Sequence, residues 1–160
     1  MNELALPAIA SVAGWTLVAV AGGLLPRLGD WYYALRKPSW QPPDWLFGPA
    51  WTLIFLLIAI SSVMAWNAAA PAGRPTLLAL LVVNGVLNIA WSGIFFTMRR
   101  PDWALWEVAL LWLSILALVI WIWPISSTAS LLLVPYLAWV SFASILNLAI
   151  VRLNPDRMGR

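Results

Sequence analysis

The sequence predicts an all-α integral membrane protein, a bundle of five transmembrane helices with a structured first loop. Of its 160 residues, 63% are hydrophobic and only 9% are charged, and the mean hydropathy is +0.88. A soluble domain carries about 25% charged residues, so this composition excludes a water-soluble globule. We expect residues 1–160 to form one membrane domain.

Four uncharged runs define the spans, since a span needs about 20 apolar residues. The run from 108 to 151 holds 44 residues, enough for two spans, and Pro124 followed by Ser126-Ser127-Thr128 supplies a turn and an N-cap between them. The first run follows Met1-Asn2-Glu3, which has no Lys or Arg, so we expect a transmembrane helix there rather than a cleaved signal peptide. The helices are predicted at about 5–25, 45–67, 76–98, 102–123 and 127–152.

Lysine and arginine residues are distributed unevenly among the loops. One cation, Arg74, lies on one side of the predicted bundle, and eight lie on the other: Arg27, Arg36, Lys37, Arg99, Arg100, Arg152, Arg157 and Arg160. Cytoplasmic loops carry the excess of positive charge, so the first loop and the C-terminus are expected in the cytoplasm and the N-terminus outside. These cations are expected to contact lipid headgroups and not nucleic acid.

The loop predicted at 26–44 is dense in aromatic residues and prolines. Its prolines forbid a continuous helix, while disordered linkers are poor in aromatic residues. We therefore expect a rigid lid that leads into the next helix. The stretch that carries the pattern is Trp31-Tyr32-x-x-Leu35-x-Lys37-Pro38-x-Trp40-x-Pro42-Pro43-x-Trp45-x-Phe47-x-Pro49-x-Trp51.

The chain has no cysteine and no histidine. This excludes disulfides, thiolate nucleophiles, Ser-His-Asp triads and zinc or haem sites built on those ligands, and no metal site is predicted. Glu107 is the only acidic residue inside a predicted span, about one turn from its cytoplasmic end. An ionisable residue in a membrane suggests function, but at this depth Glu107 is more readily explained by snorkelling to the interface or by serving the helix dipole.

The thirteen tryptophans fall into two groups. Eight lie near predicted helix ends, where an indole ordinarily anchors the interface. Five lie inside the spans, where the indole N–H needs a partner and an anchoring role does not apply. These five are Trp15, Trp51, Trp91, Trp112 and Trp139.

Polar residues at helical spacing accompany the deep tryptophans. Trp139, Ala143 and Asn147 follow one stripe at i, i+4 and i+8, with the small Ala143 leaving room between two larger groups. Asn84, Asn88 and Ser92 form a second stripe. Amides in hydrocarbon must bond across helices or face a cavity, and Pro135 interrupts the last helix beside its stripe. The pattern fits either polar contacts that hold the bundle together or a binding cavity.

Three blocks of sequence resemble the translocator protein, or tryptophan-rich sensory protein, family, also called the peripheral-type benzodiazepine receptor family, in a bacterial form. The first block is the lid stretch given above. The other two are Asn88-Ile89-Ala90-Trp91-Ser92-Gly93-Ile94-Phe95-Phe96 followed by Trp103-Ala104-Leu105, and Pro135-Tyr136-Leu137-Ala138-Trp139 through Ala143 to Leu146-Asn147.

The resemblance implies a homodimer with a pocket beneath the first loop for tetrapyrroles such as protoporphyrin IX, and for synthetic isoquinoline or benzodiazepine-type ligands. Porphyrin would be a ligand, and no cofactor is required. Animal members are associated with cholesterol, but here the Tyr that precedes the corresponding Arg152 is absent, which leaves sterol binding there open. Carried over by motif, the ligand-binding residues are Tyr32, Trp51, Asn88, Trp91, Trp103, Trp139, Ala143, Leu146 and Asn147.

Three functions follow from the resemblance: a porphyrin receptor or sensor, a light- and oxygen-dependent porphyrin-degrading enzyme with Trp51 and Trp139 as redox partners, and a porphyrin or sterol transporter. As a receptor, the pocket would stack the macrocycle, and cations at its mouth would pair with the propionates. The candidate cations are Arg27, Arg36, Lys37 and Arg152.

Two expectations concern assembly and location. The small residues Gly85, Ser92 and Gly93 suggest that the helix at 76–98 forms the dimer interface. Helical bundles of this hydrophobicity are typical of the bacterial inner membrane, although some relatives have been assigned to the outer membrane.

Overall fold

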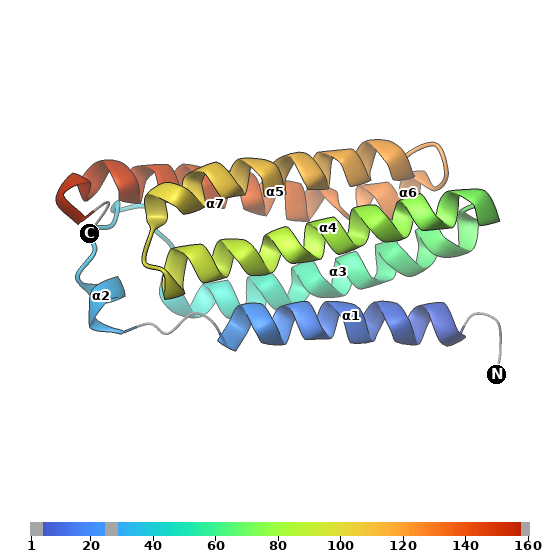
Figure 1. The fold of residues 1–160 in the computed structure, drawn as a ribbon, viewed down its shortest axis with the longest axis horizontal. Helices are drawn as coiled ribbons and strands as arrows, with labels where there is room; N and C mark the ends of the chain where they lie inside the picture. Colours follow the sequence, from blue (N-terminus) through green and yellow to red (C-terminus); the bar gives the residue numbers. More distant parts are fainter. Residues whose placement is uncertain (1–4, 25–28, 158–160) are drawn as a thin grey trace.

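Every regular element in the described part of the chain, residues 5–24 and 29–157 of this computed structural model, is a helix (Figure 1). Four helical segments are long and apolar enough to cross a membrane, namely Asp44–Ala68, Pro71–Thr97, Pro101–Ile122 and Ser127–Leu153, and Ile9–Gly23 forms a shorter apolar helix. The chain is therefore a membrane helical bundle. Its main elements are α1 (Ala5–Leu24), α2 (Asp30–Tyr33), α3 (Phe47–Ala68), α4 (Arg74–Ser92), α5 (Pro101–Ile122), α6 (Ser127–Leu131) and α7 (Val134–Leu153).

The helix expected at 127–152 is divided into α6 and α7. Pro135 lies in the first turn of α7, where its missing N–H and fixed φ are tolerated, so the break falls just before it. The predicted N-cap is present, since the Ser126 hydroxyl accepts a hydrogen bond from the Ala129 N–H at 3.3 Å. The helix expected at 76–98 also changes form, because α4 ends at Ser92 and continues as a π-helical turn, η3 (Gly93–Thr97).

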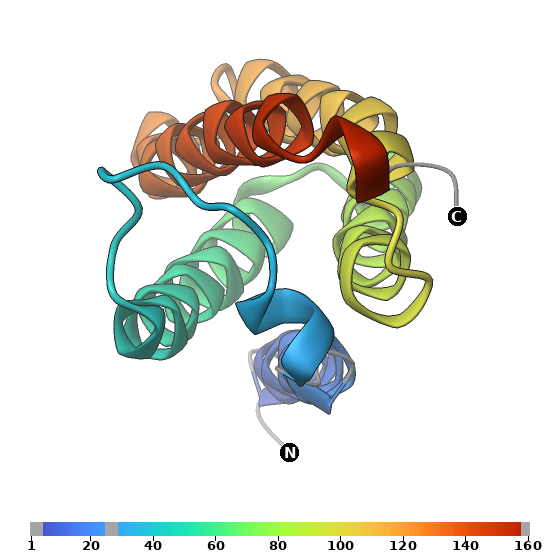
Figure 2. The ribbon, with the colours of Figure 1, turned by 90° about the vertical axis from the view of Figure 1, so that its left-hand side faces the viewer.

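The long helices form a ring when seen along the bundle (Figure 2). α5 packs on α7 and α4, α1 packs on α3 and α4, and α3 meets α6 at the end of the bundle far from α2. Near α2, α3 has few contacts with α7. The bundle is thus tightly packed at the far end, around Ile58, Leu77, Leu118, Ile122 and Leu133, and more open at the end that carries α2.

Buried hydroxyl groups join the helices of the packed end. Ser61 Oγ donates to the carbonyl of Ala129 at 2.7 Å, and Ser130 Oγ donates to the carbonyl of Val119 at 2.7 Å. Ser11 Oγ donates to the carbonyl of Ala59 at 3.2 Å and so ties α1 to α3. Such bonds replace the hydrophobic effect, which cannot hold helices together in lipid.

Gly85 of α4 faces α1 within the same chain. A Cβ at this position would lie 3.3 Å from Val18 Cγ2, and Gly85 itself is buried. The close approach of two helices therefore explains this glycine, as small residues permit in membranes. Of the three small residues predicted to face a second copy, Gly85 is covered by α1 and Ser92 is buried beside it, so these two do not present a free surface. Gly93 is half-buried.

The lid, of which residues 29–44 are described, crosses the open end of the ring (Figure 2). Tyr32 and Leu35 are buried against Phe95, Leu146 and Ile150. Asn154, just beyond α7, holds the lid backbone: its Oδ1 accepts from the Arg36 N–H at 2.8 Å, and its Nδ2 donates to the carbonyls of Arg36 and Ile150, both at 2.8 Å. One buried amide thus fastens the lid to the last helix.

Asn154→Ala should loosen the lid, because it removes three hydrogen bonds from a site that is 4% exposed and leaves backbone groups of Arg36 unpaired. We expect a loss of about 1–3 kcal/mol in local stability. Hydrogen exchange should become faster at 30–43 and stay unchanged in α5. The exposed Asn67→Ala is the matched control, and equal exchange in both variants would contradict the lid attachment.

Candidate ligand-binding cavity

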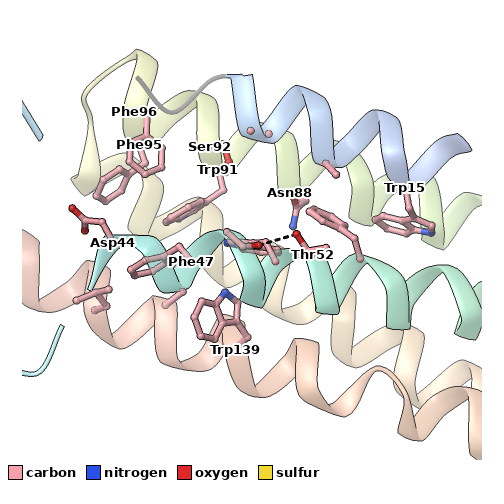
Figure 3. A pocket seen from close by; sticks show the side chains of 18 of the residues that line it. Trp15, Asp44, Phe47, Thr52, Asn88, Trp91, Ser92, Phe95, Phe96 and Trp139 are labelled. Carbon is pink, nitrogen blue, oxygen red and sulfur yellow. Dashed lines mark hydrogen bonds between the residues drawn. The ribbon is translucent and has the colours of Figure 1, made fainter. Parts of the chain in front are cut away.

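A cavity of about 610 Å³ lies beneath the lid, between α1, α3, α4 and α7 (Figure 3). It lies at the open end of the bundle, near α2, where α3 and α7 make few contacts. Small-molecule sites have volumes of about 300–1,000 Å³ and mostly apolar walls with a few polar groups. Both the size and the lining of this cavity match that description.

Aromatic rings make up much of the wall. On α3, Phe47, Trp51 and Phe55 recur every four residues, and the Trp51 and Phe55 rings are stacked with centroids 5.4 Å apart. On the opposite side, Trp91 stacks on Phe95 at 5.3 Å. The wall therefore offers flat apolar faces from two sides, which suits a planar aromatic ligand.

One wall of the cavity is fixed by a buried network around the Tyr136 hydroxyl group. That hydroxyl accepts from Asn88 Nδ2 at 3.0 Å and donates to Asn84 Oδ1 at 3.3 Å. Asn84 Nδ2 in turn donates to Ser114 Oγ at 2.8 Å, which links α4 and α7 to α5. Asn88 lines the cavity, but its amide nitrogen donates a hydrogen bond to the Tyr136 hydroxyl group.

Asn147 also lines the cavity while bonding to α5. With its amide oxygen turned toward the Leu105 N–H at 3.2 Å and its amide nitrogen toward the Pro101 carbonyl at 3.1 Å, the side chain satisfies both groups. It therefore closes the wall between α7 and the first turn of α5. Asn88 and Asn147 therefore join helices and border the cavity at once, whereas Asn84 only joins helices.

The in-span tryptophans differ in how their indole N–H groups are used. Trp15 Nε1 donates to Ser62 Oγ at 3.2 Å, and Trp112 Nε1 donates to Ser141 Oγ at 2.8 Å. The ring nitrogens of Trp91 and Trp139 are buried and have no partner among the described residues. Both of these tryptophans line the cavity, and neither indole N–H is committed to another group of the described structure.

Three polar side chains surround the lid end of the cavity: Tyr32, Gln41 and Asp44. The Tyr32 hydroxyl donates to Asp44 Oδ1 at 2.9 Å, and Gln41 Nε2 lies 3.2 Å from the same oxygen. Burial and the neighbouring Asp44 raise the pKa of Tyr32 well above its usual value. Lys37 lies outside, with its Nζ 3.5 Å from the centroid of the Tyr32 ring, and burial lowers its pKa.

The structure brings together eight of the nine residues expected to bind ligand. Tyr32, Trp51, Asn88, Trp91, Trp139, Ala143, Leu146 and Asn147 all line the cavity. Trp103 does not; it is 51% exposed and lies beside the Arg100 guanidinium, 4.4 Å from its ring centroid. It lies on the outer face of α5 because the buried face of that helix carries Ala104 and Glu107 instead.

Among residues 29–157 no arginine or lysine lines the cavity, although Lys37 lies at its lid end with its Nζ 3.5 Å from the centroid of the Tyr32 ring. The pairing of cations at the mouth with propionates therefore stays a prediction, and Arg27 lies outside the described residues.

The expectation for Glu107 differs from the structure. Glu107 is 8% exposed, and neither of its carboxyl oxygens has a partner in the described structure. It does not reach the interface, because its side chain lies on the buried face of α5 with Val108 and Leu111.

Sequence reasoning missed the contribution of α1 and the full extent of the α3 stripe. Phe47, Phe55 and Ala59 line the cavity with Trp51, and their four-residue spacing could have identified them. α1 contributes Trp15, Thr16 and Ala19, together with its two glycines near the lid. Trp15 is one of the five tryptophans inside the predicted spans, whereas the small residues of α1 gave no chemical signal on their own.

Comparison with known proteins agrees with this arrangement. The model of the TspO/MBR family matches residues 6–153. The chain is 39% identical to the tryptophan-rich protein TspO of Chlorobaculum tepidum over 97% of this chain and 100% of that protein. It is 35% identical to the tryptophan-rich sensory protein of Cereibacter sphaeroides (87% and 85%) and 36% identical to the translocator protein of Sus scrofa (96% and 94%).

Tyr136→Phe should destabilise the bundle by about 1–3 kcal/mol, because the amides of Asn84 and Asn88 both lose their bond to the hydroxyl in a buried site. Thermal unfolding in detergent measures the effect. Tyr33→Phe removes a hydroxyl from a residue that is 61% exposed and serves as the control. Equal melting temperatures for the two variants would show that the network contributes nothing.

Proposed function

The chain belongs to the TspO/MBR family, and from this membership and its central cavity we propose that it is a membrane receptor for tetrapyrroles of the protoporphyrin IX class. The observation that carries the proposal is the aromatic cavity beneath the lid. It combines stacked rings on two walls with a few polar groups at defined positions. A planar macrocycle can stack between such walls, and related flat hydrophobic molecules would occupy the same space.

The proposed membrane arrangement has five spans, formed by α1, α3, α4, α5 and the α6–α7 pair. α1 begins at the opposite end of the bundle from the end of α7 (Figure 1), as an odd number of spans requires. Described cations gather at the lid end, and only Arg74 lies at the other end. By the positive-inside rule the lid and the C-terminus face the cytoplasm and the N-terminus lies outside, in the inner membrane of a bacterial cell.

A homodimer also belongs to this proposal. Since α1 covers Gly85, the interface between two copies must use another surface than the one suggested by the sequence.

Ala143→Phe should abolish binding of bulky ligands. Ala143 lines the cavity between Trp139 and Asn147, so a phenyl ring there would fill space that the ligand needs. We expect the affinity for protoporphyrin IX, measured by tryptophan quenching of the purified protein, to fall by at least about tenfold, or ~1.4 kcal/mol. Ala138→Phe is the matched control, since Ala138 is exposed on the same helix and does not line the cavity. Wild-type affinity in Ala143→Phe would refute the site.

A second candidate function is light- and oxygen-dependent breakdown of the bound porphyrin. This function is favoured because Trp51 and Trp139 both line the cavity and indoles are readily oxidised. Trp139 also keeps its N–H free of any partner in the described structure. In this mechanism the two indoles would act as electron or radical partners of the excited macrocycle, and oxygen would be the oxidant.

Replacing both Trp51 and Trp139 by Phe separates the two functions. Phenyl rings keep most of the stacking area but are much harder to oxidise, so the double variant should bind porphyrin within about threefold of wild type, a loss under ~1 kcal/mol. Under illumination its porphyrin absorbance should persist longer than in wild type. In the control variant, phenylalanine replaces Trp45 and Trp106, whose side chains are 71% and 80% exposed. If the porphyrin bleaches in the double variant at the wild-type rate, the breakdown is photochemistry of the ligand alone, and the protein is a receptor and not an enzyme.

A further inference from the structure

One serine of the membrane helices uses its hydroxyl group differently from the others. Among the described residues, every other buried or half-buried serine in a helix donates to a backbone carbonyl, as expected where no water is available. These serines are Ser11, Ser61, Ser62, Ser114, Ser130, Ser141 and Ser144. Ser92, at the end of α4, is 9% exposed and lines the cavity, and no hydrogen bond joins its hydroxyl group to a described residue.

Asn88 places a second oxygen without a described partner one turn away on α4. Its Nδ2 donates to the Tyr136 hydroxyl, which donates in turn to Asn84 Oδ1. Because these bonds run in one direction, they fix the orientation of the Asn88 amide and leave its Oδ1 as an acceptor. Asn88 and Ser92 are four residues apart and therefore share a face of the helix, and both line the cavity.

Gly22 of α1 lies opposite these two oxygens. A Cβ at Gly22 would be 3.8 Å from Ser92 Oγ and 4.0 Å from Asn88 Oδ1, and Gly22 also lines the cavity. Both oxygens therefore point from α4 toward α1, where the missing side chain leaves a small polar notch; Figure 3 shows Asn88 and Ser92 beside the end of α1. The buried polar atoms that lack any partner include the indole nitrogens of Trp91 and Trp139 but neither of these oxygens, so the notch is accessible from the cavity.

We propose that Gly22, Asn88 and Ser92 form a hydrogen-bonding subsite for a carboxyl or carboxamide group of the ligand. The carbonyl oxygen of that group accepts from the Ser92 hydroxyl, and its O–H or N–H donates to Asn88 Oδ1. One such group satisfies both protein atoms, which would otherwise stay unpaired in an apolar cavity. The inference rests on the proposed tetrapyrrole function and makes it more specific: Ser92 binds one acid group of the macrocycle, held in the neutral form that apolar surroundings favour.

Two porphyrins separate this contact from general packing in the cavity. Protoporphyrin IX carries two carboxyl groups, whereas etioporphyrin has the same macrocycle with alkyl substituents only. The affinities for both are measured by tryptophan quenching in wild type and in Ser92→Ala. We expect Ser92→Ala to bind protoporphyrin IX about fivefold more weakly than wild type, the scale of one lost hydrogen bond, and to bind etioporphyrin as wild type does.

Gly22→Ala tests the subsite from the other helix. The added methyl group would make ordinary van der Waals contacts at 3.8 and 4.0 Å, so the helices need not move, but it would cover the two oxygens. This variant should therefore lose affinity for protoporphyrin IX and keep its affinity for etioporphyrin. Wild-type affinity for protoporphyrin IX in Gly22→Ala would overturn the subsite.

Ser144→Ala is the matched control, because Ser144 is half-buried on α7, donates to the Val140 carbonyl and does not line the cavity. In Ser92→Ala, an equal loss of affinity for both porphyrins, or no loss for either, would overturn the subsite, and so would the same selective loss in Ser144→Ala. Failure of wild type to bind either porphyrin would instead refute the proposed function, so the two failures are distinguishable.

Discussion

The rest of the structure depends on the hydrogen bonds that the Tyr136 hydroxyl group makes with two asparagines of α4. In a membrane the helices gain nothing from burying apolar side chains away from lipid, so specific polar contacts and close packing must fix their positions. The bonds from Tyr136 to Asn84 and Asn88, extended to Ser114, hold α4, α5 and α7 as one unit. α1 and α3 pack on each other through Trp15 and Ser11, and the space between the two units becomes the cavity.

A cavity of this kind needs a cover, and the lid supplies it without regular secondary structure over most of its length. Prolines prevent it from forming a helix, and its backbone must find partners elsewhere. Asn154 provides them at Arg36, while Tyr32 and Leu35 anchor the lid in the apolar cluster below. Because the same Tyr32 lines the cavity, the cover and the ligand-contacting wall are one element. Any movement of the lid would change the site directly.

Helical periodicity predicted much of the site, since it fixes which residues share a face. The stripe of Trp139, Ala143 and Asn147 does line the cavity, and the four-residue spacing from Phe47 to Trp51 extends the same logic to α3. Periodicity does not say which neighbour covers a face. The covering of Gly85 by α1, the burial of Glu107 and the outward position of Trp103 depend on the rotation of each helix in the bundle, which is set by contacts between distant residues.

The central claim is that ligand binds among the buried indoles and not on the tryptophan-rich surface. Nuclear magnetic resonance of the protein labelled with ¹⁵N at its tryptophan side chains tests this most directly, because each indole N–H gives its own signal. Adding protoporphyrin IX should shift or broaden the signals of Trp51, Trp91 and Trp139 and leave those of the exposed Trp45, Trp106 and Trp123 unchanged. Changes confined to the exposed tryptophans would contradict the claim and place the porphyrin on the outside of the bundle.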